Sequence, residues 1–182
     1  MPKRLSYEES CQVLQQRGFL DPGDIPPLPS RMPHPDDAPL GVSFFRTGVW
    51  DDELPNLTLP RTFFGRSEVS HISFHNTDFP ESWLCWNDFI DVDFTDADLS
   101  HSDLRASVFR NVRFIRADLC GADLRRSEYT DCDFTAARMK GARLTRAQGE
   151  VLRLSAEQHR EISWQDEDGE EPSGGVMALN KA

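Results

Sequence analysis

An apolar residue recurs at every fifth position of this chain, and this period constrains the fold more than any other feature. Hydrophobic residues make up only 38% of the sequence, so 21 of them in one uninterrupted phase is not a chance arrangement. Neither the helix period of about 3.6 residues nor the strand period of about 2 produces it. The chain is therefore expected to turn every five residues. The series is Phe44, Val49, Leu54, Leu59, Phe64, Val69, Phe74, Phe79, Leu84, Phe89, Phe94, Leu99, Leu104, Phe109, Phe114, Leu119, Leu124, Tyr129, Phe134, Met139 and Leu144.

Small residues occupy most positions two before the apolar ones, as in Ala97-Asp98-Leu99-Ser100-His101 and Ala122-Asp123-Leu124-Arg125-Arg126. These blocks resemble the pentapeptide-repeat family, whose motif is A(D/N)LXX, over residues 59–146, and by phase alone over 44–58. In that family four pentapeptides form one square coil. The resemblance implies an all-β solenoid, a right-handed quadrilateral β-helix of about five coils with short N- and C-terminal helical caps.

A square coil of four pentapeptides places residues 20 apart on top of one another, and the sequence allows a test of this. Like side chains sort into columns at that step, as stacked rungs at a spacing of about 4.8 Å require. One column is aromatic, one is mainly leucine and a third is mixed. They read Phe74, Phe94, Phe114 and Phe134; Leu84, Leu104, Leu124 and Leu144; and Val69, Phe89, Phe109 and Tyr129.

The flanks predict covers for the two ends of the solenoid, which must be capped or offered to a partner. Residues 1–43 are interpreted as a helix, opened by the capping box at Ser6 and ended near Gly18, followed by a proline-rich arm (residues 21–40) that runs extended along the body. Residues 44–148 are the β-helix. Residues 149–164 are interpreted as one capping helix, and 165–182 as an acidic disordered tail.

Bulk properties exclude several classes of function. No apolar run approaches the roughly 20 residues that cross a bilayer, and no signal peptide is evident, so a cytoplasmic protein without a membrane contact is expected. The formal net charge of −11 argues against direct nucleic-acid binding and for a basic partner. Four scattered cysteines form no metal or disulfide motif.

No catalytic residue, cofactor or metal site is predicted, so the chain is not expected to be an enzyme. Of the five histidines only His71 and His75 are close in sequence, and they fall on adjacent faces of the grid. A metal site there would need a corner geometry and further ligands, and surface histidines are the simpler interpretation. The aspartates before the central apolar residues follow the grammar of the family rather than that of a calcium-binding repeat.

Charge and exposed aromatic residues mark two candidate binding features. Residues 78–103 hold eight acidic residues and no lysine or arginine, whereas 105–146 hold ten basic and five acidic residues, so the rod is expected to be polarised along its axis. This is either a solvated surface or a docking surface for a basic groove. The grid also points Phe63, Trp83 and Trp86 outward, either under the proline-rich arm or against a partner.

The leading hypothesis is an immunity-type inhibitor that occludes the basic surface of a bacterial toxin, such as a nuclease delivered by type VI secretion. The alternatives are a DNA-mimicking protein that binds and protects DNA gyrase, and a general interaction scaffold; the oligomeric state is left open. The candidate partner-binding residues are Phe63, Trp83 and Trp86 as anchors and Asp78, Asp88, Asp98 and Asp103 as steering charges.

Overall fold

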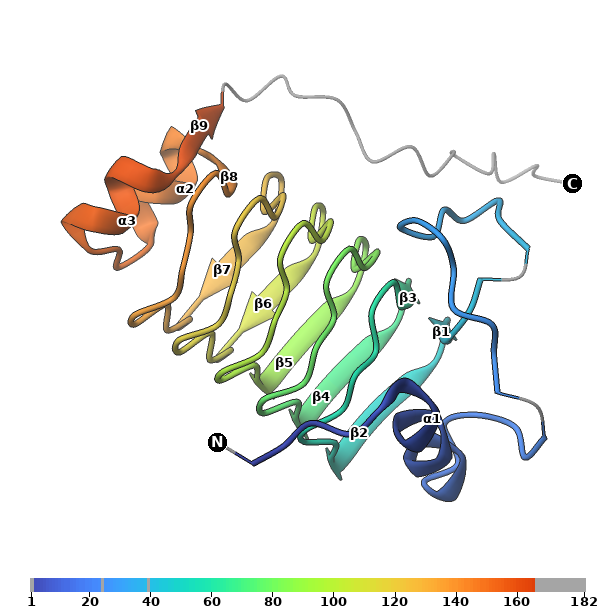
Figure 1. Cartoon of the computed structure of the whole chain (residues 1–182). Coiled ribbons are helices and arrows are strands. Elements are labelled where there is room, and N and C mark those ends of the chain that lie inside the picture. The colour runs from blue at the N-terminus through green and yellow to red at the C-terminus, as the bar shows by residue number, and fades with distance from the viewer. Residues whose placement is uncertain (1, 24, 39, 166–182) are drawn as a thin grey trace, which may run out of the picture.

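The computed structural model describes residues 2–23, 25–38 and 40–165, and they form a β-solenoid. The strands step along a rod, with α1 at one end and α2 and α3 at the other (Figure 1). The elements in chain order are α1 (Tyr7–Gln16), β1 (Ser43–Phe45), β2 (Gly48–Glu53), β3 (Phe63–Gly65), β4 (Glu68–Ser73), β5 (Asp88–Asp93), β6 (Val108–Arg110), β7 (Glu128–Thr130), β8 (Arg143–Thr145), α2 (Arg146–Val151), α3 (Ala156–Glu161) and β9 (Ser163–Gln165).

Strand pairing confirms the 20-residue register. Five parallel strands form one sheet in the order β2-β4-β5-β6-β7, and Val69 pairs with Phe89 and Phe89 with Phe109. Single parallel bridges join the other sides at the same step, such as Asp78 with Asp98. The rod therefore has four faces, which we name by the first inward residue of each column: face A from Phe44, face B from Val49, face C from Leu54 and face D from Leu59.

The chain turns at each corner through a residue with left-handed backbone conformation. This residue lies two positions after each inward apolar residue, and the series runs at a step of five from Arg46 to Gly141. Asparagine, aspartate and glycine tolerate this conformation better than other residues, and several corners carry them, such as Asn56, Asp91 and Gly121. The corner series explains the five-residue period physically.

The predicted aromatic column forms the spine of the core. Phe94 and Phe114 stack at 5.6 Å between ring centroids, and Phe114 and Phe134 at 4.8 Å. On the neighbouring face Phe89 and Phe109 stack at 5.1 Å. These rings are at most 1% exposed, so the inward direction predicted for them is confirmed.

The small inward residues also carry hydrogen bonds between coils. The Ser107 hydroxyl donates to the carbonyl oxygen of Leu84 at 2.9 Å, and the Ser107 amide donates to the Ser127 hydroxyl at 3.1 Å. Ser67, Asn87 and Ser107 repeat this pattern along one column. The polar side chains therefore connect successive coils instead of leaving buried groups without partners.

The N-terminal segment covers the first coil as predicted. Helix α1 begins at Ser6, whose side chain forms the expected capping box with Glu9, and Gly18 follows it with a φ of 77°. Leu14 is fully buried, and Phe19 meets Phe44 edge-on at 6.2 Å. The helix thus closes one end of the core.

The C-terminal end differs from the single helix predicted over 149–164. Two short helices, α2 and α3, are joined by an extended segment and followed by β9, because Thr145 and Ser155 each begin a helix through a capping box of their own. Strand β9 pairs with β8, Leu144 with Trp164, so the chain completes about six turns rather than five. Gln165 belongs to β9, and the tail predicted beyond it lies outside the described residues.

The two helices close the last coil through equivalent glutamine side chains. The Gln148 amide donates to the carbonyl oxygens of Leu124 and Ser127 at 3.0 and 2.9 Å. The Gln158 amide donates to those of Phe134 and Ala137 at 2.8 and 3.0 Å. Each amide replaces the donors that another coil would supply. Among the described helices none is long and apolar enough to cross a membrane.

Candidate protein-binding surface

The proline-rich arm covers two of the three aromatic residues predicted to be exposed. Phe63 and Trp83 stack on each other at 6.2 Å on face A but are only 2% and 5% exposed, because Met32 and Leu40 pack against them. The expectation that these two rings are open anchors is therefore wrong, and the interpretation in which the arm covers them is confirmed. Trp86 remains 44% exposed at the corner between faces A and B.

Specific contacts hold the arm in this position. His34 meets Trp83 edge-on at 5.6 Å, and Arg61 donates to the carbonyl oxygen of Pro29 at 2.9 Å. Gly41 has a φ of 72°, and a Cβ atom there would lie 2.7 Å from the Pro29 ring. Pro29 of the arm therefore lies too close to the backbone of Gly41 for any larger residue at this position.

The four predicted steering charges lie on three different faces. Asp78 and Asp98 lie in successive rungs of face D, Asp88 begins β5 on face B, and Asp103 lies on face A. Asp103 is only 7% exposed, and the guanidinium of Arg105 binds it through two nitrogens at 2.8 and 2.5 Å. These four carboxylates do not form one patch.

Asp78 is a partly buried carboxylate that lies beside a positive charge but has one oxygen without a hydrogen bond among the described residues. The Arg4 guanidinium lies 3.0 Å from its Oδ1 atom, but without hydrogen-bonding geometry, so that oxygen accepts no hydrogen bond among the described residues. Burial raises the pKa of Asp78 to about 6, the charge of Arg4 opposes this, and that of Asp98 adds to it. Arg4 also donates to the Asn76 carbonyl oxygen at 2.9 Å, so the N-terminal segment lies against Asp78.

Ion pairs between successive coils involve residues of both the acidic and the basic segment. Asp96 binds Arg116 at 2.6 Å, Asp93 binds Arg113 at 3.0 Å, and Asp118 binds Arg138 at 2.7 Å. Each pair is separated by 20 residues, one full coil. Asp93 and Asp96 of the acidic segment thus pair with arginines of the basic segment across the boundary between them, whereas Asp118 and Arg138 both belong to the basic segment.

Face A below the aromatic residues carries a buried ionic ladder. Arg125 binds Asp123 through two nitrogens at 2.8 and 2.7 Å, and Arg105 lies 3.6 Å from the same carboxylate. Burial acts to raise the pKa of Asp123, but its hydrogen bonds with Arg125 and the neighbouring positive charges outweigh this and lower the pKa. The ladder satisfies its own charges and is structural.

The central part of face B combines acidic and aromatic residues without cover. Trp86 and Asp88, two of the predicted site residues, lie next to each other at the start of β5. Ile90 and Asp91 follow on the same strand, and Glu68 and Trp50 lie on the rungs before it. Trp50 is 55% exposed, and Asp88 and Glu68 are exposed. We call this set, Trp50, Glu68, Trp86, Asp88, Ile90 and Asp91, the face B patch.

The borders of the face B patch set its charge. The corner toward face C carries Asp51, His71 and Asp91; His71 lies between the two carboxylates, at 3.9 Å from Asp51 and 3.2 Å from Asp91. The corner toward face A carries Arg46 and Arg66, but at the coil of Asp88 this position is Trp86. The patch is therefore most acidic along β5.

Sequence reasoning missed Trp50 and Glu68 as surface residues of this patch. Their positions follow from the 20-residue register, since Trp50 lies one rung from Ser70 and two from Ile90, and Glu68 one rung from Asp88. Reading outward columns as well as inward ones would have found them. No group of three or more metal-ligating side chains occurs among residues 2–23, 25–38 and 40–165, which includes His71 and His75.

Comparisons with known proteins agree with this architecture. Residues 88–126 match the family described as pentapeptide repeats, in eight copies. HetL, a pentapeptide repeat protein involved in heterocyst differentiation regulation from the cyanobacterium Nostoc sp. strain PCC 7120, is similar in structure. The TM-score is 0.53 at 18% sequence identity, over 55% of this chain and 48% of HetL. The similarity thus spans about half the length of HetL and concerns the fold.

Two further pentapeptide repeat proteins show weaker likeness. AT2G44920 from the Arabidopsis thaliana thylakoid lumen has a TM-score of 0.41 at 20% identity, over 62% of this chain and 71% of its own. Rfr23 from the cyanobacterium Cyanothece 51142 has a TM-score of 0.42 at 13% identity, over 68% and 88%. No curated protein matches the chain by sequence. The family match assigns pentapeptide repeats to residues 88–126, and the five-residue repeat and the 20-residue register extend the same coil geometry along the solenoid on both sides of them.

Proposed function

We propose that this protein is a non-enzymatic inhibitor that binds a basic protein partner through face B, as an immunity protein does when it neutralises a toxin. The observation that carries the proposal is the face B patch, where Asp88, Asp91 and Glu68 surround exposed apolar side chains on a regular parallel sheet. Acidic groups steer a basic partner, and large aromatic side chains supply most of the contact energy at interfaces.

A nuclease toxin is the partner class that this surface fits best. Enzymes that bind nucleic acid present lysine and arginine to the phosphates, because neutralising phosphate charge dominates their affinity. An acidic sheet that covers such a surface excludes the substrate. Since a nuclease acts where nucleic acid is present, we place the inhibitor in the cytoplasm.

Trp50 is the proposed apolar anchor. Its ring lies over Gly48, where a Cβ atom would come within 1.6 Å of the ring, so the indole lies flat along β2 with its other side open. A ring held against the backbone loses little conformational freedom on binding, which favours a tight contact.

The test combines capture with a charge-matched pair of variants. The tagged full-length chain is used to capture partners from its own cells, which are then identified by mass spectrometry, with gyrase supercoiling measured in parallel. We expect one small basic protein whose nuclease activity is inhibited, with association that weakens as salt rises. Inhibited supercoiling with gyrase subunits captured would instead support the gyrase-binding alternative.

The variant pair locates the surface. Glu68→Gln with Asp88→Asn removes two charges from face B, and Glu157→Gln with Glu161→Gln removes two from helix α3. The first pair should slow association at least several-fold and the second should leave it unchanged. Equal effects of the two pairs would show that net charge alone drives binding, and would refute the assignment to face B.

A further inference from the structure

The last coil leaves part of its backbone without a following rung. In the coil before it, the Asn111 amide donates to the Thr130 carbonyl oxygen at 2.9 Å, and the Phe114 amide to that of Asp133 at 2.7 Å. The corresponding amides one coil later belong to Asp131 and Phe134, and within the described part of the chain they donate no hydrogen bond. Strand β7 is the last strand of its sheet, so its outer edge is open.

The capping helices close the coil on both sides of this edge but not across it. Gln148 reaches the carbonyl oxygen of Ser127 on one side, and Gln158 reaches those of Phe134 and Ala137 on the other. Between them the extended segment that joins α2 to α3 passes over the edge without pairing with it. The open stretch is therefore residues 128–134, which covers the end of face B and the start of face C.

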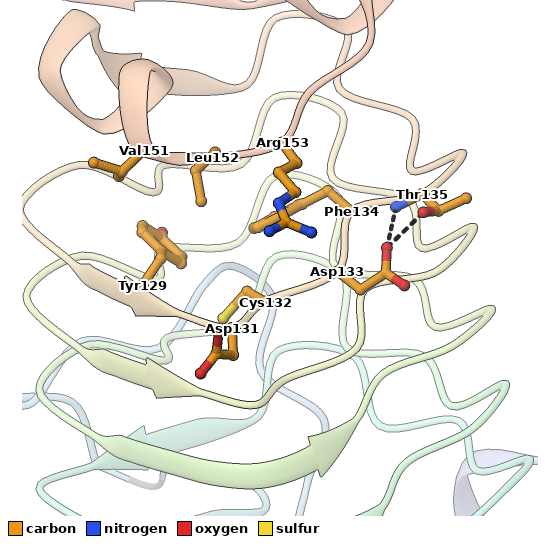
Figure 2. Close-up of a pocket in the computed structure, with 9 residues that line it drawn as sticks. All are labelled: Tyr129, Asp131, Cys132, Asp133, Phe134, Thr135, Val151, Leu152 and Arg153. Carbon is orange, nitrogen blue, oxygen red and sulfur yellow. Dashed lines mark hydrogen bonds between the residues drawn. The ribbon is translucent and has the colours of Figure 1, made fainter.

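A cleft of about 520 Å³ lies along this open stretch, a size usual for ligand-binding pockets. Figure 2 shows Val151, Leu152 and Arg153 on one wall and, on the other, Tyr129 and residues 131–135. Tyr129, Phe134 and Leu152 line it with apolar surface, and Asp131 and Asp133 add carboxylates. Asp133 accepts hydrogen bonds from the side chain and backbone of Thr135, which lower its pKa and keep it ionised.

We propose that this cleft binds an extended segment of a partner protein, which adds to β7 as a further parallel strand. The inference rests on the proposed function as a protein-binding inhibitor and specifies how the partner docks. The open amides of Asp131 and Phe134 would be satisfied by carbonyl oxygens of the added strand, as they are between all inner coils. Pairing of backbone groups gives affinity in such contacts, and side-chain pockets give specificity.

The inner coils also define which side chains the added segment carries. At the corner between faces B and C, His71 and Asn111 bind the two sides of Asp91, at 3.2 and 2.5 Å. Two positions further along the chain, on face C, Arg113 binds Asp93. The next members of these two columns are Asp131 and Asp133, so the segment needs a hydrogen-bond donor over the first and a basic residue over the second.

The apolar lining completes the pattern. An apolar residue of the segment packs on Tyr129, which is only partly buried, as Phe109 stacks on Tyr129 at 5.2 Å from the inner side. The sequence pattern expected for the segment is therefore apolar, any residue, donor, small or apolar, basic. The chain's own residues 109–113, Phe-Arg-Asn-Val-Arg, have this pattern.

The probe for the test is a synthetic peptide with the sequence of residues 108–115, Val-Phe-Arg-Asn-Val-Arg-Phe-Ile. Binding to the full-length chain is measured by fluorescence anisotropy, and backbone amide exchange by NMR. We expect saturable binding with at least tenfold slower exchange at the amides of Tyr129, Asp131 and Phe134. A control peptide with aspartate in place of its asparagine and second arginine should bind at least tenfold more weakly.

Two variants, each removing one negative charge at one end of the same corner column, distinguish binding in the cleft from attraction to any acidic residue. Asp131→Asn keeps a residue that tolerates the left-handed conformation and should weaken peptide binding several-fold, while Asp51→Asn should not change it. No binding, binding without protection of the three amides, or equal loss in both variants would overturn strand addition. Self-association of the chain through this edge, seen by sedimentation and abolished by the peptide, would instead assign the edge to a second copy and also overturn it.

These readouts are independent of the proposed function itself. Glu68 and Asp88 lie on β4 and β5, away from the cleft. Their variants therefore test partner binding through face B, and the peptide experiment tests strand addition at β7, without either result deciding the other.

Discussion

Replacing Phe114 by alanine tests the stacked core most sharply. The ring is 0% exposed, stacks on Phe94 and Phe134, and meets Phe109 edge-on at 5.6 Å. A coil in the middle of a solenoid is held from both sides and cannot collapse around a cavity, so the loss is expected at the usual value for such a change, about 3–5 kcal/mol. For a chain of this size that lowers the melting temperature by roughly 6–20 °C.

The assay is urea unfolding followed by far-ultraviolet circular dichroism, with Phe114→Leu as the matched control. Leucine occupies the equivalent inward position at Leu99 and Leu104, so it fits the coil geometry and should cost less than half as much as alanine. If Phe114→Ala costs less than about 1 kcal/mol, the ring is not a rung of a packed column and the register is wrong.

Three further outcomes are expected. Gln148→Ala and Gln158→Ala each remove two hydrogen bonds to carbonyl oxygens of the last coil and leave one of these oxygens, that of Ser127 or of Ala137, without a donor; each should lower the free energy of unfolding by about 1–3 kcal/mol in urea titrations, against no change for a surface Gln→Ala. Burial raises the pKa of Asp78 to about 6 in the folded state, so the stability that its protonated form contributes is complete below its unfolded pKa and is lost as pH rises through about 6. Asp78→Asn should therefore raise the free energy of unfolding at pH 7 by at most about 3 kcal/mol and flatten this part of the pH profile. An unchanged profile would contradict the raised pKa of Asp78. Trp83→Ala should release the proline-rich arm, seen as faster proteolysis within it, while partner binding through face B persists; loss of binding would return Trp83 to the interface.

The solenoid was predictable because its signal is local and repeated. Each inward residue is set by the corner two positions after it, and the corner recurs every five residues, so the phase at Phe74 and Phe134 is the same. Stacking of like side chains then follows from the register alone. The number of turns was less certain, because β9 returns to the register at Trp164 after two helices that lack the repeat.

The burial of Phe63 and Trp83 was not predictable in the same way. Their cover is the proline-rich arm, whose contacts with them span several tens of residues and have no period. The repeat register correctly predicted that both rings point outward from the coil. It could not decide whether the proline-rich arm or a partner protein covers them. Trp86 lies one corner further round, beyond the reach of Met32 and Leu40, and stays exposed.

The ion pairs between rungs were not foreseen because charge was summed along the sequence. Asp93 and Arg113 belong to oppositely charged segments, yet they are neighbours in adjacent rungs. Charges in a solenoid must be read down the 20-residue columns. Read this way, Asp91 and Asp93 of β5 have partners in adjacent rungs, whereas Asp88, predicted as a site residue, is exposed at the start of the same strand.

The C-terminal cap was misread for a different reason. Apolar residues between 151 and 162 were assigned to one helix, but Leu152 and Ile162 are extended residues that end α2 and α3 and enter the core at 8% and 6% exposure. The two capping boxes at Thr145 and Ser155 were visible in the sequence and mark two helix starts.

The most direct test of partner binding through face B uses two variants. One carries a photoreactive amino acid at Ile90, in the middle of the face B patch, and the other carries it at Ser100 on face D. Both variants are irradiated in the protein's own cells and their cross-linked products identified by mass spectrometry. If the partner binds through face B, Ile90 yields one cross-linked basic protein and Ser100 yields none. The same product from Ser100, with none from Ile90, would contradict binding through face B.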